Sequence, residues 1–346
     1  MFSFRTTGFN GYAVQYSPFF DTKLACAASA NFGLVGNGRL YVLGLTSSGI
    51  VAEKWFDTQD GLFDCAWSES HENQVVVATG DGSIKLFDIL LNDYPVQNWR
   101  EHGREVFSVN WNLVGKTTFC TSSWDGLIKI WAPNRSKSIA TLRPPQGVTP
   151  SCTYSASFSP YSATVMASCS SDSIMRFWDP RAGEYPTNSV MAHNGAEILS
   201  LDWNRYRPDV IATSSVDKTI KVWDMRFLGA ATAGGVAHAS PVNEFVGHAY
   251  AVRKIAWSPH DPDLLLSASY DMTARVWQDN TAFEQRDQVP ITRGQQPNHN
   301  QLRGVWDRHS EFVVGCDWSL WGTAGWVATT GWDEMVYVWD VRCVLR

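Results

Sequence analysis

Short runs of alternating apolar and polar residues, rich in β-branched and aromatic side chains, recur along the whole chain. Typical runs are SIKLFD at 83–88, TIKVWD at 219–224 and LLLSAS at 264–269. Alternation with a period of two places every second side chain on the same face of a β-strand. Turn residues separate the runs, and no stretch has a helical period of useful length. The pattern therefore predicts an all-β protein.

One phrase repeats at nearly constant intervals. It consists of a tight turn with an aspartate and a strand whose aromatic residue lies six positions after that aspartate. The six full copies pair Asp81 with Phe87, Asp125 with Trp131, Asp172 with Trp178, Asp217 with Trp223, Asp271 with Trp277 and Asp333 with Trp339. A degenerate first copy, GNGRLYVLG at 36–44, keeps the spacing from Asn37 to Leu43. The seven terminal positions are 44, 44, 47, 45, 54 and 62 residues apart, and four of these steps approach the ~40–45-residue repeat of four-stranded propeller blades.

Each repeat supplies four strands, and the chain ends suggest how the ring closes. Only seven residues follow Trp339, too few for a turn and an outer strand, so the N-terminal FSFRTT is expected to fill that place. We therefore predict one domain over residues 1–346, a seven-bladed β-propeller closed by strands from both chain ends. Two insertions, near 228–240 and 278–308, consist of small or polar residues and are predicted to be flexible.

Four histidines repeat with the blades. His102, His193, His248 and His309 lie 23 or 24 residues before the turn aspartates of their own blades. A metal site would need the imidazoles to converge, whereas the repeat places one on each of four blades. The blades closely resemble those of WD-repeat proteins, and this resemblance implies that each histidine bonds its turn aspartate. We therefore expect structural roles for these histidines and for all six turn aspartates, and we predict no metal site.

Charge, hydropathy and cysteine content exclude several functional classes of protein. The net charge of -6 argues against a general nucleic-acid binder, which needs a basic face. No run is long and apolar enough for a membrane span, and the N-terminus lacks the pattern of a secretory signal. The seven cysteines form no CxxC pair and lie mostly in apolar runs, which indicates reduced, buried thiols in a cytosolic protein.

No catalytic or cofactor-binding motif appears, so we predict a non-enzyme without cofactors that binds polypeptide on one flat face of the propeller. Three positions in each blade are expected to point to the face that carries the aspartate turns. These positions supply aromatic residues and carboxylates, namely Phe63, Phe107, Trp124, Tyr154, Tyr270, Trp332, Glu105 and Glu197, with Asp64 close in sequence. An apolar floor with an acidic wall suits an amphipathic basic helix, because carboxylates accept bidentate bonds from arginine.

Several less generic phrases identify a family. They include GYAVQYSPFFDTKLACAASANFGLVGNGRLYVL, DGLFDCAWSE, EHGREVFSVNW, AHNGAEILSLDW and GHAYAVRKIAWSP. Over residues 9 to 340 the chain resembles the peroxisomal targeting signal type 2 receptors, which are WD-repeat peroxins. The resemblance implies a receptor in the cytoplasm and peroxisome that captures matrix proteins by an N-terminal nonapeptide, Arg/Lys–Leu/Val/Ile–five residues–His/Gln–Leu/Ala. It further implies a peroxin co-receptor, delivery to the peroxisomal docking complex and no stable membrane insertion.

The family resemblance also implies an acidic groove on the turn face. The matching positions in this chain are Asp64, Glu105 and Glu197, although strand alternation allows Asp64 to turn toward the blade core instead. The two insertions are either neutral decoration or additional contacts for the co-receptor.

An alternative function is that of a WD-repeat substrate receptor of a cullin-type ubiquitin ligase. Such proteins often carry Trp-Asp-x-Arg after the third strand of a blade. Three segments fit this motif, at 178–181, 223–226 and 339–342. The motif is weak evidence, because its Asp and Arg also serve local turn bonds.

Overall fold

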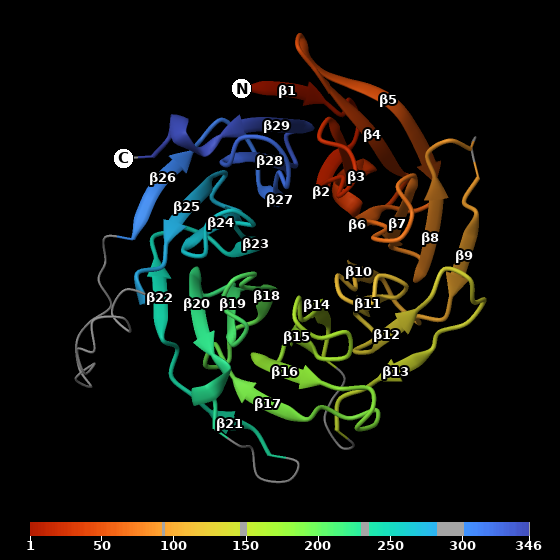
Figure 1. Cartoon of the computed structure of the whole chain (residues 1–346). Coiled ribbons are helices and arrows are strands. Elements are labelled where there is room, and N and C mark those ends of the chain that lie inside the picture. The colour runs from red at the N-terminus through yellow and green to blue at the C-terminus, as the bar shows by residue number, and fades with distance from the viewer. Residues whose placement is uncertain (92–93, 146–150, 230–234, 282–300, 346) are drawn as a thin grey trace.

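Seven small sheets surround a central channel in the computed structural model of the chain (Figure 1). The structure describes residues 1–91, 94–145, 151–229, 235–281 and 301–345. Neighbouring strands within each blade are antiparallel, as hairpin connections require. The predicted all-β, seven-bladed propeller is therefore confirmed.

The strands occupy equivalent places in the seven blades. The innermost strands, which line the channel, are β2 (Asn10–Tyr16), β6 (Leu62–Trp67), β10 (Val106–Trp111), β14 (Thr153–Phe158), β18 (Ile198–Trp203), β23 (Val252–Trp257) and β27 (Val313–Trp318). The second strands are β3 (Lys23–Ser29), β7 (Gln74–Thr79), β11 (Phe119–Ser123), β15 (Met166–Ser170), β19 (Val210–Ser215), β24 (Leu264–Ser269) and β28 (Trp326–Gly331). The third strands are β4 (Gly38–Thr46), β8 (Ser83–Asp88), β12 (Ile128–Trp131), β16 (Ile174–Trp178), β20 (Thr219–Asp224), β25 (Ala274–Gln278) and β29 (Met335–Asp340).

The outer strands complete the blades and close the ring. They are β5 (Gly49–Thr58), β9 (Gln97–Arg100), β13 (Ala140–Leu142), β17 (Asn188–Met191), β22 (Asn243–Val246), β26 (Leu302–Trp306) and β1 (Phe2–Arg5). As predicted, β1 pairs with β29, from Phe2 opposite Val338 to Arg5 opposite Met335, so the last blade joins both chain ends (Figure 1). Three short 3-10 helices occur in the described ranges, η1 (Ala30–Gly33), η2 (Met225–Phe227) and η3 (Val341–Cys343). None of the helices found there has the length and apolar character needed to cross a membrane.

The insertion near 228–240 contributes a strand to a neighbouring blade. Residues 230–234, and residues 282–300 of the other insertion, lie outside the described residues. Beyond the first gap, β21 (Ala237–His238) pairs in parallel with β17 and makes that sheet five-stranded. This part of the insertion therefore covers an outer strand edge, which otherwise presents unpaired backbone groups.

The repeated histidines and aspartates tie the strands within a blade. His248 Nδ1 lies 2.7 Å from Asp271 Oδ2, and its Nε2 lies 2.7 Å from Ser267 Oγ. The indole of Trp277 donates to the same hydroxyl at 2.8 Å. The equivalent imidazole–carboxylate distances, for His102 to Asp125, His193 to Asp217 and His309 to Asp333, are 2.9, 2.8 and 2.9 Å. Burial lowers the pKa of His193 and His248, so these imidazoles are neutral at physiological pH.

The turn aspartates of the two blades that lack this histidine use other partners. Asp81 Oδ1 accepts a bond from Thr79 Oγ1 at 2.5 Å and one from the backbone N–H of Ser83 at 2.9 Å. Asp172 binds Arg176, whose Nη2 lies 2.6 Å from Asp172 Oδ2. All six turn aspartates thus cap their own hairpins.

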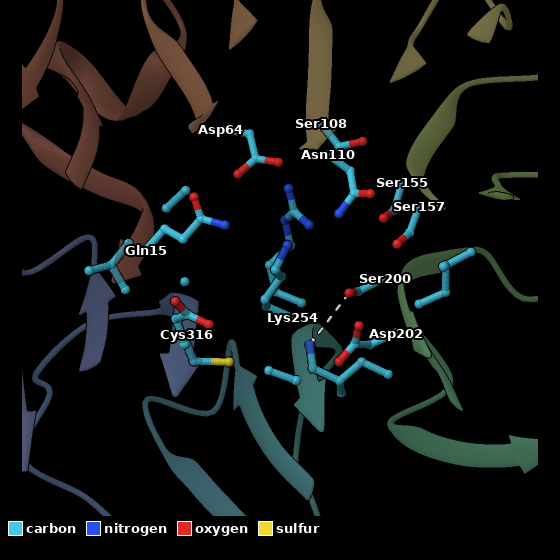
Figure 2. A pocket seen from close by; sticks show the side chains of 18 of the residues that line it. Gln15, Asp64, Ser108, Asn110, Ser155, Ser157, Ser200, Asp202, Lys254 and Cys316 are labelled. Atoms are coloured by element: carbon cyan, nitrogen blue, oxygen red, sulfur yellow. Dashed lines mark hydrogen bonds between the residues drawn. The ribbon is translucent and has the colours of Figure 1, made fainter. Parts of the chain in front are cut away.

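Polar side chains of the innermost strands connect adjacent blades around a channel cavity of about 130 Å³ (Figure 2). In four blades, the side chain of the residue directly before the aromatic end of the innermost strand accepts a bond from a backbone N–H of the next blade. These bonds join Trp67 N to Gln15 at 2.7 Å, Phe158 N to Asn110 at 3.0 Å, Trp257 N to Asp202 at 2.7 Å and Tyr16 N to Asp317 at 2.8 Å. Ser157 and Ala256 occupy this position in two other blades, and there an indole of the next blade donates to the backbone carbonyl. The Trp203 indole donates to Ser157 O at 3.3 Å, and the Trp318 indole donates to Ala256 O at 2.9 Å. These hydrogen bonds between the innermost strands of adjacent blades, which we call the polar seam, line the channel and stabilise the closed ring.

Candidate binding face

A continuous series of aromatic rings crosses the face that carries the aspartate turns. We call this series the aromatic band; it consists of Tyr12, Phe32, Phe63, Phe107, Trp124, Tyr154, Tyr270, Phe312 and Trp332. Successive ring centroids are 4.9 Å apart for Tyr270 and Phe312, 5.2 Å for Phe312 and Trp332, and 5.9 Å for Trp332 and Tyr12. The spacing stays at 5.1 Å from Tyr12 through Phe63 and Phe107 to Trp124. Six of the predicted site residues therefore belong to one surface.

A left-handed turn places Phe32 beside Trp332 of the band. Asn31 and Phe32 have φ angles of 48° and 58°, a region that bulky side chains rarely adopt. Two bonds support this conformation, since Asn10 Oδ1 accepts from Phe32 N at 2.8 Å and the hydroxyl of Tyr12 donates to Phe32 O at 2.5 Å. The Phe32 ring, 46% exposed, consequently lies 5.5 Å from the Trp332 ring. With Leu34, Glu311 and Phe312, these two rings line an open, mainly apolar recess.

The end of the band at Trp124 and Tyr154 is acidic. The hydroxyl of Tyr154 donates to Glu197 Oε2 at 2.8 Å. Among the described residues, no basic side chain lies within 4.0 Å of the Glu197 carboxylate. Burial raises the pKa of Cys152, Arg104 lowers it, and the carboxylates of Glu197 and Glu105 raise it further. Glu105 contacts Arg104, which lies over Trp124, and the Trp124 ring lies beside Tyr154, so both predicted acids are near the Tyr154 end of the band.

Asp64 does not share this position, so its predicted place on the face is corrected. Neighbouring residues of a strand point to opposite sides, and Asp64 points into the channel while Phe63 joins the band (Figure 2). Its Oδ2 accepts a bond from Val109 N at 3.0 Å, and the side chain is buried. Burial raises the pKa of Asp64, and the nearby ammonium of Lys254 opposes that shift. Asp64 is thus part of the polar seam between blades.

Three members of the band, Tyr12, Phe32 and Phe312, and the neighbouring Arg253 were not among the predicted cargo contacts, although Arg253 and Phe312 stand at repeat positions expected to point to this face. Tyr12 and Arg253 occupy the same strand position as Phe63 and Phe107, four residues before the aromatic end, so alignment of the repeats contained the information. The Arg253 guanidinium lies 4.7 Å from the Phe107 ring centroid, and the residue is buried where it lines the channel cavity. Phe312 also fits a repeat position. No repeat marks Phe32, because only the left-handed turn brings its ring to the band.

The chemistry of this face suits binding rather than catalysis. The accessible side chains are aromatic rings and carboxylates, and the indole N–H groups of Trp124 and Trp332 are buried without an acceptor within the described residues. The same part of the chain contains no cluster of three or more His, Cys, Asp or Glu side chains that could hold a metal. A ligand that fits must supply apolar surface for the rings and cations for the carboxylates.

The Trp-Asp-x-Arg segments are explained by local bonds. Arg181 Nη2 lies 2.6 Å from Asp179 Oδ2, and Arg226 Nη2 lies 2.5 Å from Asp224 Oδ2. The pair Asp340 and Arg342 forms the same contact. Each arginine is therefore engaged by the aspartate of its own motif, and the motif needs no adaptor protein to account for it.

Comparison with known proteins identifies the repeats and then the family. The model for "WD domain, G-beta repeat" matches residues 93–132, 137–179, 184–224 and 239–278. The chain is 47% identical to the peroxisomal targeting signal 2 receptor of Komagataella phaffii over 99% of both chains. It is 44% identical to the receptor of that name from Saccharomyces cerevisiae, covering 98% of this chain and 99% of the relative, and 34% identical to the mouse receptor, covering 98% and 96%.

The fold, the repeats and the bonding within the blades define this chain as a WD-repeat β-propeller, and its turn face combines aromatic rings with carboxylates. Within that class, the chain belongs to the peroxisomal targeting signal 2 receptor family.

Proposed function

We propose that this chain is an import receptor that captures peroxisomal matrix proteins by their N-terminal type 2 targeting signal. It binds the signal as an amphipathic helix across the aromatic band, acts with a peroxin co-receptor and delivers its cargo to the peroxisomal docking complex. The observation that carries the proposal is the continuous aromatic band with Glu197 and Glu105 at one end, in a chain from this receptor family. The receptor shuttles between cytoplasm and peroxisome.

The geometry of the signal supports this assignment. Its basic first residue and its His or Gln at position eight are seven residues apart, which is about two helical turns or roughly 10 Å along the axis. The apolar residues at positions two and nine have the same separation, so both pairs lie on one side of the helix. A helix of this kind presents a basic stripe beside an apolar stripe, which matches carboxylates beside aromatic rings.

Binding of a fluorescent Arg-Leu-x5-His-Leu peptide, measured by anisotropy with candidate co-receptor present, tests the proposal. The control peptide carries Glu at the Arg and His positions. We expect selective binding of the basic peptide and a large loss for the receptor variant Glu105→Arg with Glu197→Arg. Truncating one partner of a desolvated ion pair costs about 2 to 5 kcal/mol, so the double variant should bind at least about a hundredfold more weakly.

A matched variant separates the site from overall charge. Asp21 and Glu72 are exposed in loops at the opposite end of the inner strands, so Asp21→Arg with Glu72→Arg changes the net charge equally without touching the face. This control should bind the peptide like the wild type. Equal losses in both variants, or unchanged binding by the face variant with the fold intact by circular dichroism, would reject the acidic site.

A further inference from the structure

Arg104 occupies the acidic end of the aromatic band in the free receptor. Its Nε lies 3.5 Å from Glu105 Oε2, and its guanidinium carbon lies 5.6 Å from the centroid of the Trp124 ring. The Arg104 side chain is 54% exposed and the Glu105 side chain 33% exposed. An arginine beside a carboxylate and above an indole is the arrangement that the proposed function expects for the basic residue of the cargo.

The blade itself does not require a cation at this position. The equivalent residues of the other blades, one before the position of Glu105, are Phe9, Asp60, Ser151, Ala196, Tyr250 and Glu311. The bond that ties this segment to its blade uses the backbone, since Ser123 Oγ donates to Arg104 O at 3.2 Å. That bond does not depend on the side chain at position 104, so the guanidinium is not needed to tie this segment to its blade.

We propose that Arg104 is an internal competitor for the basic residue of the cargo, an inference that rests on the proposed function. In the free receptor Arg104 holds Glu105 and covers Trp124, and the cargo helix binds by displacing it. The displacement is feasible because an exposed ion pair and an exposed cation–π contact are each weak. When cargo leaves, Arg104 returns to Glu105, so release does not expose an unpaired carboxylate. The contact therefore tunes a transport receptor toward reversible binding.

The test compares Arg104→Gln with Lys218→Gln in the same anisotropy assay. Lys218 is exposed in the aspartate turn of another blade on the same face, so its substitution removes the same charge away from Glu105 and Trp124. We expect Arg104→Gln to bind the basic peptide about three- to tenfold more tightly, the range expected when weak exposed contacts no longer have to be broken. A peptide with Gln in place of its first Arg should bind both variants like the wild type.

A double-mutant cycle gives a second readout. In a Glu105→Gln background, Arg104→Gln should no longer tighten binding, because the contact for which Arg104 competes is already lost. Equal tightening by Lys218→Gln, or persistence of the Arg104 effect without Glu105, would show a general charge effect and overturn the proposal.

The outcomes separate this inference from the proposed function. If the wild type fails to distinguish the basic peptide from its Glu-substituted control, the proposed function fails and the competitor role fails with it. If the wild type distinguishes them and Arg104→Gln binds equally or more weakly, only the competitor role is refuted. Weaker binding would assign Arg104 a direct contact with cargo.

Discussion

Asp317→Asn should stabilise the propeller at neutral pH. Asp317 Oδ2 accepts the backbone N–H of Tyr16 across the junction of the last and first blades. An asparagine fits this role, since Asn110 holds the N–H of Phe158 at 3.0 Å from the same position of its own strand. The substitution therefore keeps the bond and removes a charge from an enclosed site.

The magnitude follows from the pKa. Burial raises the pKa of Asp317 to about 6, against opposing charges of Arg205 and Lys254. A folded-state pKa above the unfolded value means that the carboxyl stabilises the fold fully only below about pH 4 and loses that contribution as the pH rises through about 6. Two pKa units correspond to at most about 3 kcal/mol. Because the side chain faces the channel, water reduces the cost, and we expect a gain of about 1 to 3 kcal/mol at pH 7.5.

The assay is urea unfolding of wild type and Asp317→Asn at pH 7.5 and pH 5.0. The gain in unfolding free energy at pH 5.0 should be about half of that at pH 7.5, because protonation then relieves much of the cost in the wild type. The reciprocal variant Asn110→Asp should be destabilised at pH 7.5 and recover as the pH falls. A loss of stability for Asp317→Asn at pH 7.5 would refute the reasoning and show that Lys254 and Arg205 make the charge favourable.

Two further variants test the acidic end of the band and the bonds within a blade. Tyr154→Phe removes the hydroxyl that holds Glu197 but keeps the ring contacts. Peptide affinity in the anisotropy assay should therefore fall about three- to tenfold, while the melting temperature barely changes. An unchanged affinity would show that the hydroxyl does not orient the glutamate. His309→Ala leaves the enclosed Asp333 carboxylate without its imidazole partner. The free energy of unfolding in urea should therefore fall by about 2 to 4 kcal/mol, while peptide affinity stays unchanged. A decrease below about 0.5 kcal/mol would contradict the assigned structural role.

The repeat geometry explains why much of the candidate binding face was predictable. A position that points to the face in one blade points there in every blade, so the repeats identified Trp124, Tyr270 and Trp332 as neighbours of one surface. The same reasoning places Arg253 on the face without marking it as a cargo contact, and applied to the first blade it also gives Tyr12. Asp64 shows the limit of this reasoning. Adjacent side chains of a strand point in opposite directions, so a residue one position away from Phe63 points into the channel and not to the turn face.

The sequence by itself determined the all-β class, the seven blades, the closure by both chain ends and the family. These features follow from alternation, from a fixed spacing and from the requirement that every blade bury its faces against neighbours. Only the tertiary structure decided which side chains meet on the turn face, within a blade and between blades. It joined Tyr154 to Glu197, placed Phe32 on the band through a left-handed turn and set Arg104 beside Glu105 and over Trp124. Such contacts depend on the path of each loop and on the closed ring, and no local pattern of residues encodes them.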